Sequence, residues 1–395
     1  MSTKRLLALL APALCVTQLL CQPAPPSAEC HAEAVFERVS HLLQSRQYED
    51  AAKALNKLQQ CSSLPAIDRF QIGWLYGRAR HFHTALKAFD SVPKNVPDLV
   101  THQYAVALSK FELADYRGAS EVLKSLQSQS AFDPKCANLL AVSYSKLGSY
   151  QDAYAVLAQD IHSHPDDLNA YLNLITVCAE SENFAKAAEM ATEASRLFPQ
   201  SSEVFVARGA ADTLLGHLAQ AREDFTTAAH VAPNAGEPRF FLALTEYKLG
   251  KYSDAVAILR SALADGIVDA DLQYLMAECL LKLDPTATQK VLEQLNRAIE
   301  LNSNSISART LRGRLLLEAG QTKEALVDLE LANRLDPTSR SAKYNLARAY
   351  RAEGRTDEAR SLFNRFRSQT GDTLKELGDK RLNQALSQAS AGGQP

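Results

Sequence analysis

Residues 148–157 read GSYQDAYAVL, and residues 250–259 read GKYSDAVAIL. In both stretches a glycine is followed five residues later by an alanine and nine residues later by a leucine. The alanine belongs to a column that recurs every 34 residues, with one two-residue insertion near Asp284. Its members are Ala51, Ala85, Ala119, Ala153, Ala187, Ala221, Ala255, Val291, Ala325 and Ala359. A fixed period of this length is typical of stacked structural repeats.

Two further columns keep the same register. Twelve residues before the alanine the chain carries a small or aliphatic residue, such as Gly73, Ala141 or Gly313. Four residues after it the chain carries an apolar residue, at Leu55, Phe89, Leu123, Leu157, Ala191, Phe225, Leu259, Leu295, Leu329 and Phe363. Small residues let two helices cross closely, and a residue four positions later lies on the same helical face. Each unit is therefore expected to be a helix–turn–helix whose apolar faces are covered by its neighbours.

At this point the sequence resembles the tetratricopeptide repeat family, which has the same period and the same Gly, Ala and Pro columns. Tyr76, Tyr144 and Tyr350 match the family's tyrosine. The resemblance implies an all-α fold, a right-handed solenoid of about ten repeats over residues 29–373. We expect residues 374–395 to form a capping helix that covers the last repeat, followed by a flexible tail.

The resemblance also implies a concave groove lined by the first helix of each repeat. Four positions should face it, at 18, 15, 11 and 8 residues before the repeat's alanine. Aromatic residues there favour apolar anchors of a partner, and arginines favour carboxylates. The expected groove residues are Phe70, Trp74, Tyr104, Leu108, Phe111, Tyr274, Arg314, Tyr344, Arg348 and Arg351. Two alternatives stay open, because the aromatic residues could be core and the arginines could be an ordinary solvated face.

The N-terminus has the pattern of an export signal. Lys4 and Arg5 precede an apolar run from Leu6 to Leu20, which is too short to span a bilayer comfortably. We expect residues 1–28 to be a signal peptide that is removed from a periplasmic or secreted protein. Retention as a membrane anchor and lipid attachment at Cys21 are the alternatives.

The cysteines agree with export. Cys30 and Cys61 fall at opposite ends of the first predicted hairpin, where the two helix ends lie side by side. We expect a disulfide between them, with two reduced, buried cysteines as the alternative. The spacing of the 7 cysteines and 9 histidines shows no zinc pattern, so no metal is expected.

Composition and motifs exclude several functional classes. Hydrophobic residues make up 46% of the chain and the formal net charge is −2, which argues against a disordered protein and against a basic nucleic-acid binder. We find no phosphate-binding loop and no catalytic motif, so we expect no cofactor and no enzymatic activity. The leading hypothesis is a cell-envelope scaffold that binds a protein or peptide in its groove. The alternative is a structural assembly factor that uses convex or end surfaces.

Overall fold

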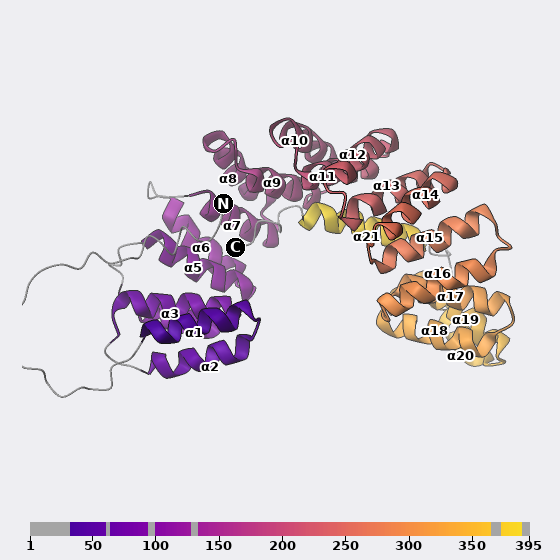
Figure 1. Ribbon diagram of the computed structural model, residues 1–395, viewed down its shortest axis with the longest axis horizontal. Coiled ribbons are helices and arrows are strands. Elements are labelled where there is room, and N and C mark those ends of the chain that lie inside the picture. The colour runs from indigo at the N-terminus through magenta and orange to yellow at the C-terminus, as the bar shows by residue number, and fades with distance from the viewer. Residues whose placement is uncertain (1–31, 61–63, 94–98, 128–132, 365–372, 389–395) are drawn as a thin grey trace, which may run out of the picture. The chain divides into compact units, whose positions relative to one another are not determined.

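A computed structural model of the chain describes residues 32–60, 64–93, 99–127, 133–364 and 373–388 (Figure 1). The chain divides into two compact units, residues 1–105 and 106–395, and each is described by itself. All regular secondary structure in the described residues is helical. The expected signal peptide, Cys30 and Cys61 lie outside the described residues.

The helices of the first unit are α1 (Ala32–Gln44), α2 (Tyr48–Gln59), α3 (Ala66–Arg78), α4 (Phe82–Asp90) and the first half of α5 (Leu99–Glu112). The second unit holds the rest of α5, then α6 (Tyr116–Gln127), α7 (Pro134–Lys146), α8 (Tyr150–Ser163), α9 (Leu168–Glu180), α10 (Phe184–Leu197), α11 (Ser202–Leu215), α12 (Leu218–Val231), α13 (Gly236–Lys248), α14 (Tyr252–Ala264), α15 (Ala270–Leu283), α16 (Thr288–Leu301), α17 (Ile306–Glu318), α18 (Thr322–Leu335), α19 (Arg340–Ala352), α20 (Thr356–Asn364) and α21 (Thr373–Gln388).

The helices up to α20 follow the predicted repeats, one odd-numbered first helix and one even-numbered second helix in each. Every member of the alanine column is buried, from Ala51 at 0% exposure to Ala359 at 3%. The apolar column four residues later is also buried wherever the structure describes its side chains. The 34-residue period therefore marks the helix crossings, as predicted.

Side-chain volumes at these crossings are matched in pairs. Gly209 on α11 faces Phe225 on α12, and a Cβ added to this glycine would lie 2.8 Å from the phenylalanine ring. Gly73 stands in the same relation to Phe89, where the added Cβ would lie 2.5 Å away. A large side chain on the second helix thus requires a missing one on the first, because protein interiors are close-packed.

Buried ion pairs tie the two helices together in two repeats. Asp328 on α18 is 1% exposed and accepts hydrogen bonds from Arg309 Nη1 at 2.7 Å and from Arg312 Nε at 2.7 Å. Arg208 and Asp224 form the equivalent pair three repeats earlier, at the same distances from the column alanine. A buried carboxylate needs such partners, since isolating the charge would be costly.

The turn inside most repeats has a left-handed residue five positions before the alanine. Gly250 adopts φ 76° in this column, and Lys251 N then donates to Glu246 O at 2.9 Å, the bond that closes a helix C-terminus. Four repeats hold a residue with a side chain there, namely Arg46, Arg80, Ala114 and Glu182, all with φ between 56° and 63°. The repeat with the insertion is different, because Asp284 Oδ1 accepts from Thr286 N at 2.8 Å instead.

The helix expected at the C-terminus forms, but it does not cap the last repeat. Helix α21 packs against α9, α11 and α17, which are first helices of earlier repeats (Figure 1). Leu382 and Leu386 on α21 are 0% and 1% exposed. The expectation failed because an apolar stripe shows that a helix is covered and does not show by which surface.

Every helix in the described part of the chain is too short or too polar to span a lipid bilayer.

We expect Gly250→Ala to lower the urea midpoint of unfolding and Ala114→Gly to raise it. An added Cβ at Gly250 meets nothing within 4 Å, so the change isolates the backbone cost, which is about 1–2 kcal/mol for a left-handed L-residue. Ala114 is exposed and already bears this cost at φ 61°, and glycine removes it, less about 0.5–1 kcal/mol of extra chain entropy. Shifts of the same sign for the two variants would contradict this account of the turn.

We expect Cys136, Cys178 and Cys279 to resist alkylation in the folded protein. The three thiols are 0%, 3% and 0% exposed, and burial raises the pKa of Cys136 and Cys279 to about 12 and that of Cys178 to about 11. Little thiolate, the reactive form, is therefore present near neutral pH. Mass spectrometry after iodoacetamide treatment, with and without guanidinium, checks this. Rapid modification of the folded chain would contradict it, and a non-reduced sample tests the Cys30–Cys61 disulfide.

Candidate functional site

The first helices of the second unit present one row of inward positions to each other and to solvent. Successive first helices pack together from α7 through α15, and α17 packs on α19. The positions predicted to face inward are those that the structure uses. On α13, for example, Phe240 and Leu244 contact α21, and Tyr247 lines an open hollow.

The open hollow has a volume of about 630 Å³ and lies between α13, α15, α17 and α19. Three cationic side chains and two carboxylates line it, so it carries a small excess of positive charge. These residues are Lys282, Arg314 and Arg348 on one hand and Glu278 and Glu318 on the other. Polar groups of Thr310, Ser341, Tyr344 and Asn345 complete the wall.

Two donors in this wall lack partners. Thr310 is 1% exposed, and among the described residues its Oγ1 has no hydrogen-bond partner. Arg314 lies one helical turn further along α17, and its buried Nε is also without a partner in the described part of the chain. Buried polar groups are nearly always hydrogen-bonded, and leaving one unsatisfied costs about 1–3 kcal/mol. Both groups point to a ligand that is polar and accepts hydrogen bonds.

The second arginine of the hollow is held loosely. Arg348 Nη1 lies 3.4 Å from Asn345 Oδ1 and 4.0 Å from Glu318 Oε1, both long for a hydrogen bond. Its guanidinium also lies 5.9 Å from the centre of the Tyr344 ring. Arg348 is therefore positioned over the hollow while much of its hydrogen-bonding capacity is left for another group.

The structure brings together three of the predicted groove residues and separates two others. Arg314, Tyr344 and Arg348 all line the hollow. Arg351 is exposed and lies outside this lining. Tyr274 corrects the prediction, because it is fully buried and its hydroxyl donates to Glu278 Oε1 at 2.7 Å. It holds a carboxylate in the wall and offers no surface of its own.

The aromatic residues predicted near the N-terminus take part in packing. Phe70 is half-buried in the first unit, with its ring 5.7 Å from that of Phe89 and 5.9 Å from that of His102. Trp74 and Tyr104 are half-buried in the same unit. In the second unit Leu108 is half-buried, and the Phe111 ring lies 5.2 Å from that of Tyr116. Phe70 thus matches the alternative of a core aromatic residue.

A second polar cluster lies where α21 crosses α13 and α15. Arg381 Nη1 lies 3.3 Å from Asp271 Oδ2, and Nη2 lies 3.7 Å from Asp269 Oδ2. The guanidinium also stacks 4.0 Å from the centre of the Phe240 ring. Burial raises the pKa of Asp271 above its ordinary value, and the positive charge of Arg381 opposes that rise.

Sequence reasoning did not single out the acidic pair on α15 or the lysine of the hollow. Asp271 occupies one of the predicted inward positions, so extending the rule to every repeat would have found it. Asp269 and Lys282 lie outside those positions, and the sequence carries no comparable signal for them.

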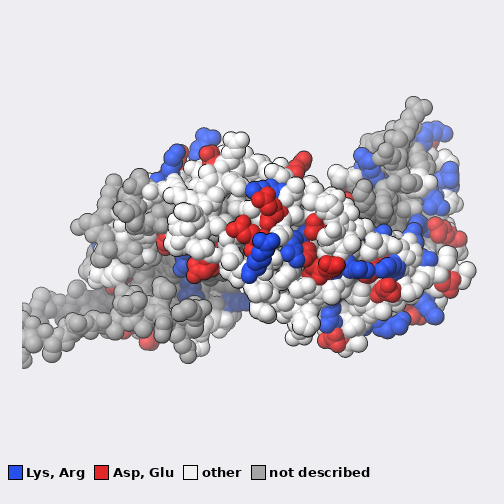
Figure 2. Space-filling model, turned by 90° about the horizontal axis from the view of Figure 1, so that it is seen from above, with Lys and Arg blue, Asp and Glu red and all other residues white. Residues whose placement is uncertain are grey.

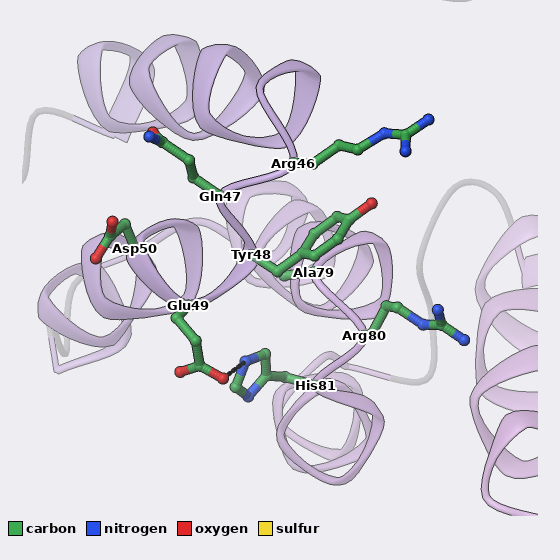
Figure 3. Close-up of a pocket in the computed structure, with 8 residues that line it drawn as sticks. All are labelled: Arg46, Gln47, Tyr48, Glu49, Asp50, Ala79, Arg80 and His81. Atoms are coloured by element: carbon green, nitrogen blue, oxygen red, sulfur yellow. Dashed lines mark ion pairs between the residues drawn. The ribbon is translucent and has the colours of Figure 1, made fainter. Parts of the chain in front are cut away.

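A further hollow of about 500 Å³ lies in the first unit, around the turns of the first two repeats (Figure 3). Its main polar contact joins His81 Nε2 to Glu49 Oε1 at 3.5 Å, and the Glu49 side chain is largely exposed. Exposed ion pairs of this kind contribute little to stability or recognition. Among the described side chains, no group of three or more His, Cys, Asp or Glu is arranged to hold a metal ion.

Surface charges of both signs are interspersed on the face seen in Figure 2, with blue and red side chains side by side. This face therefore carries no broad region of one sign, and charge recognition depends on local arrangements such as the hollow.

Comparisons with known proteins agree with the repeat architecture. Two family models, both described as tetratricopeptide repeat, match residues 316–377 in one case and residues 138–202 and 215–283 in the other. The mitochondrial import receptor subunit TOM70 of Saccharomyces cerevisiae is 24% identical over 305 residues, which cover 73% of this chain. The match covers 48% of TOM70, so the chain spans about half the length of that relative.

More distant similarities were also found. Superkiller protein 3 of Schizosaccharomyces pombe is 20% identical over 251 residues, covering 58% of this chain and 18% of that protein. The crystal structure of yeast Tom70 aligns with a TM-score of 0.41 at 18% identity, covering 90% of this chain and 95% of the other. A tetratricopeptide repeat protein from Parabacteroides merdae aligns with a TM-score of 0.49 at 17% identity, covering 63% and 98%.

The family matches fall on repeats whose column alanines are buried at helix crossings and whose turns share one geometry. The chain is a tetratricopeptide repeat protein.

Proposed function

We propose that this chain is a non-catalytic scaffold that binds another protein through the hollow between α13, α15, α17 and α19. The observation that carries the proposal is the pair of unpartnered donors, Thr310 Oγ1 and Arg314 Nε, in the wall of one hollow. A ligand that accepts hydrogen bonds would satisfy both groups and recover the cost of burying them.

The chemistry of the wall favours a carboxylate. Arginine forms paired, charge-assisted hydrogen bonds with carboxylates, which are about twice as strong as bonds between neutral groups. Arg314 and Arg348 occupy equivalent positions on neighbouring first helices, so they approach the hollow side by side. An acidic side chain or the terminal carboxylate of a peptide would fit this arrangement, with Thr310 and Asn345 supplying neutral hydrogen bonds.

We place this activity in the cell envelope. The support is the pattern of residues 1–28, with Lys4 and Arg5 before a short apolar run. TOM70, which the chain partly matches, is by its name an import receptor subunit, and a receptor of this class binds other proteins. Tethering through Cys21 or through a retained signal remains the alternative.

A structural role is the second candidate function. Helix α21 covers part of the inner face, and Val327 on the second helix α18 is 66% exposed. An assembly factor that uses its outer or end surfaces would leave the hollow without a role. The two candidates differ in their response to changes in the hollow.

We expect the double variant Arg314→Gln, Arg348→Gln to lose at least about tenfold in capture of the partner from envelope extracts. Each charge-assisted hydrogen bond contributes about 1.5–3 kcal/mol, so losing two exceeds that factor. Quantitative mass spectrometry of the captured proteins is the measurement. Arg351→Gln is the matched control, because Arg351 is an exposed arginine outside the hollow.

A partner retained by wild type and the control but not by the double variant supports binding in the hollow. Equal capture by all three chains would move the interface elsewhere and favour the structural role. Circular dichroism must show equal helicity for the comparison to count.

We expect the native protein to begin after Ala28. An export signal is cleaved at small residues after its apolar run. The intact mass of protein purified from its native membrane and soluble fractions is the measurement. A mass that includes residues 1–28 would contradict cleavage, and a lipid adduct on Cys21 would show tethering.

A further inference from the structure

Helix α21 sits on the inner face as a ligand helix would. Its buried residues follow the spacing of one helical face, at Gly378, Leu382, Ala385 and Leu386. The fit is close, since a Cβ added to Gly378 would lie 3.0 Å from Leu244 Cδ2 on α13. The segment is thus shaped to the surface that it covers.

Polar contacts fix the position of this helix along the face. At one end Thr176 Oγ1 on α9 donates to Leu386 O at 2.5 Å. In the middle Arg381 is 16% exposed and lies between Phe240 and the carboxylates of Asp269 and Asp271. Apolar contacts alone would let the helix slide, whereas a paired charge sets one register.

The surface beneath α21 is built from the same inward positions as the open hollow. Thr176, Phe240, Leu244 and Asp271 lie 11, 15, 11 and 18 residues before the reference positions of their repeats. These positions are not needed for the helix crossings, which use the alanine column and its two companions. The covered surface is therefore separate from the packing that forms the repeats.

We propose that the inner face from α9 to α15 is a binding site for an amphipathic helix of a partner protein, and that α21 is its built-in occupant. The partner helix presents a small residue, then an arginine three positions on, and leucines four and eight positions on. The arginine enters the carboxylate pair of α15 and stacks on Phe240. The apolar stripe covers α9, α11 and α13.

Competition between the two helices sets the apparent affinity. A tethered segment acts at an effective concentration on the order of mM, so a partner must bind more tightly than α21 or act when α21 has left. The proposal rests on the proposed function only for the premise that inward positions recognise proteins. The site itself lies on α9 to α15 and uses none of the donors Thr310, Arg314 and Arg348.

The test is a titration of a fluorescein-labelled peptide of residues 373–388 with two full-length chains. One chain is wild type, and the other carries Leu382→Glu and Leu386→Glu, which place charges at positions that are 0% and 1% exposed. We expect saturable binding to the variant, measured by fluorescence anisotropy, and at least about tenfold weaker binding to wild type, because its own helix competes.

Two further peptides test the register. Arg381→Glu in the peptide should weaken binding to the variant chain at least about tenfold, because it places a carboxylate against Asp269 and Asp271. Lys380→Glu is the matched control, since Lys380 is exposed on the same helix and the change in charge is the same. Full-length Arg381→Glu replaces the double variant if that chain loses helicity.

Three results would overturn the proposal. One is equal binding of the peptide to wild type and variant chains, or binding to neither. Another is an equal effect of the Arg381→Glu and Lys380→Glu peptides. The third is a wild-type dimer by light scattering, which would make α21 of a second copy the occupant. The chain with Arg314→Gln and Arg348→Gln, when combined with the displaced α21, should still bind the peptide, so the two proposals fail independently.

Discussion

The close crossing of two helices at each buried alanine is the constraint on which the rest of the structure depends. Ala153 and its equivalents leave no space for a larger group, so the first and second helices can meet only at one height. Once that height is fixed, the turn must reverse the chain within a few residues. The next repeat then finds an apolar surface of fixed shape to cover.

This constraint leaves the inward positions of the first helices free to vary. The packing columns use one face of each helix, and the inward face carries residues as different as Thr310, Phe240 and Asp271. Variation there changes what the protein can bind without changing how it folds. In the second unit the result is a covered apolar stretch beside an open polar one, both built on one set of helices.

The sequence predicted the repeats well because each column is tested many times along the chain. The left-handed turn was less visible, since Arg80 and Glu182 stand where other repeats hold glycine. Helix α21 was predicted as a helix but placed wrongly, because a single apolar stripe fits any apolar surface. The inward rule correctly grouped Arg314 with Arg348, whereas it could not tell that Tyr274 is covered or that Arg351 lies beyond the hollow.

The distribution of side chains at the turns gives the array a direction. The four turns with a side chain in the left-handed conformation all precede residue 183, whereas four of the five glycine turns of this column follow residue 200. Each of the former carries about 1–2 kcal/mol of backbone strain that the latter avoid. In an array where each repeat contacts only its neighbours, such local costs do not average out over the whole chain. Fraying should therefore start in the N-terminal hairpins and run toward the glycine turns, so that the repeats beneath α21 are among the last to lose their protection from hydrogen exchange.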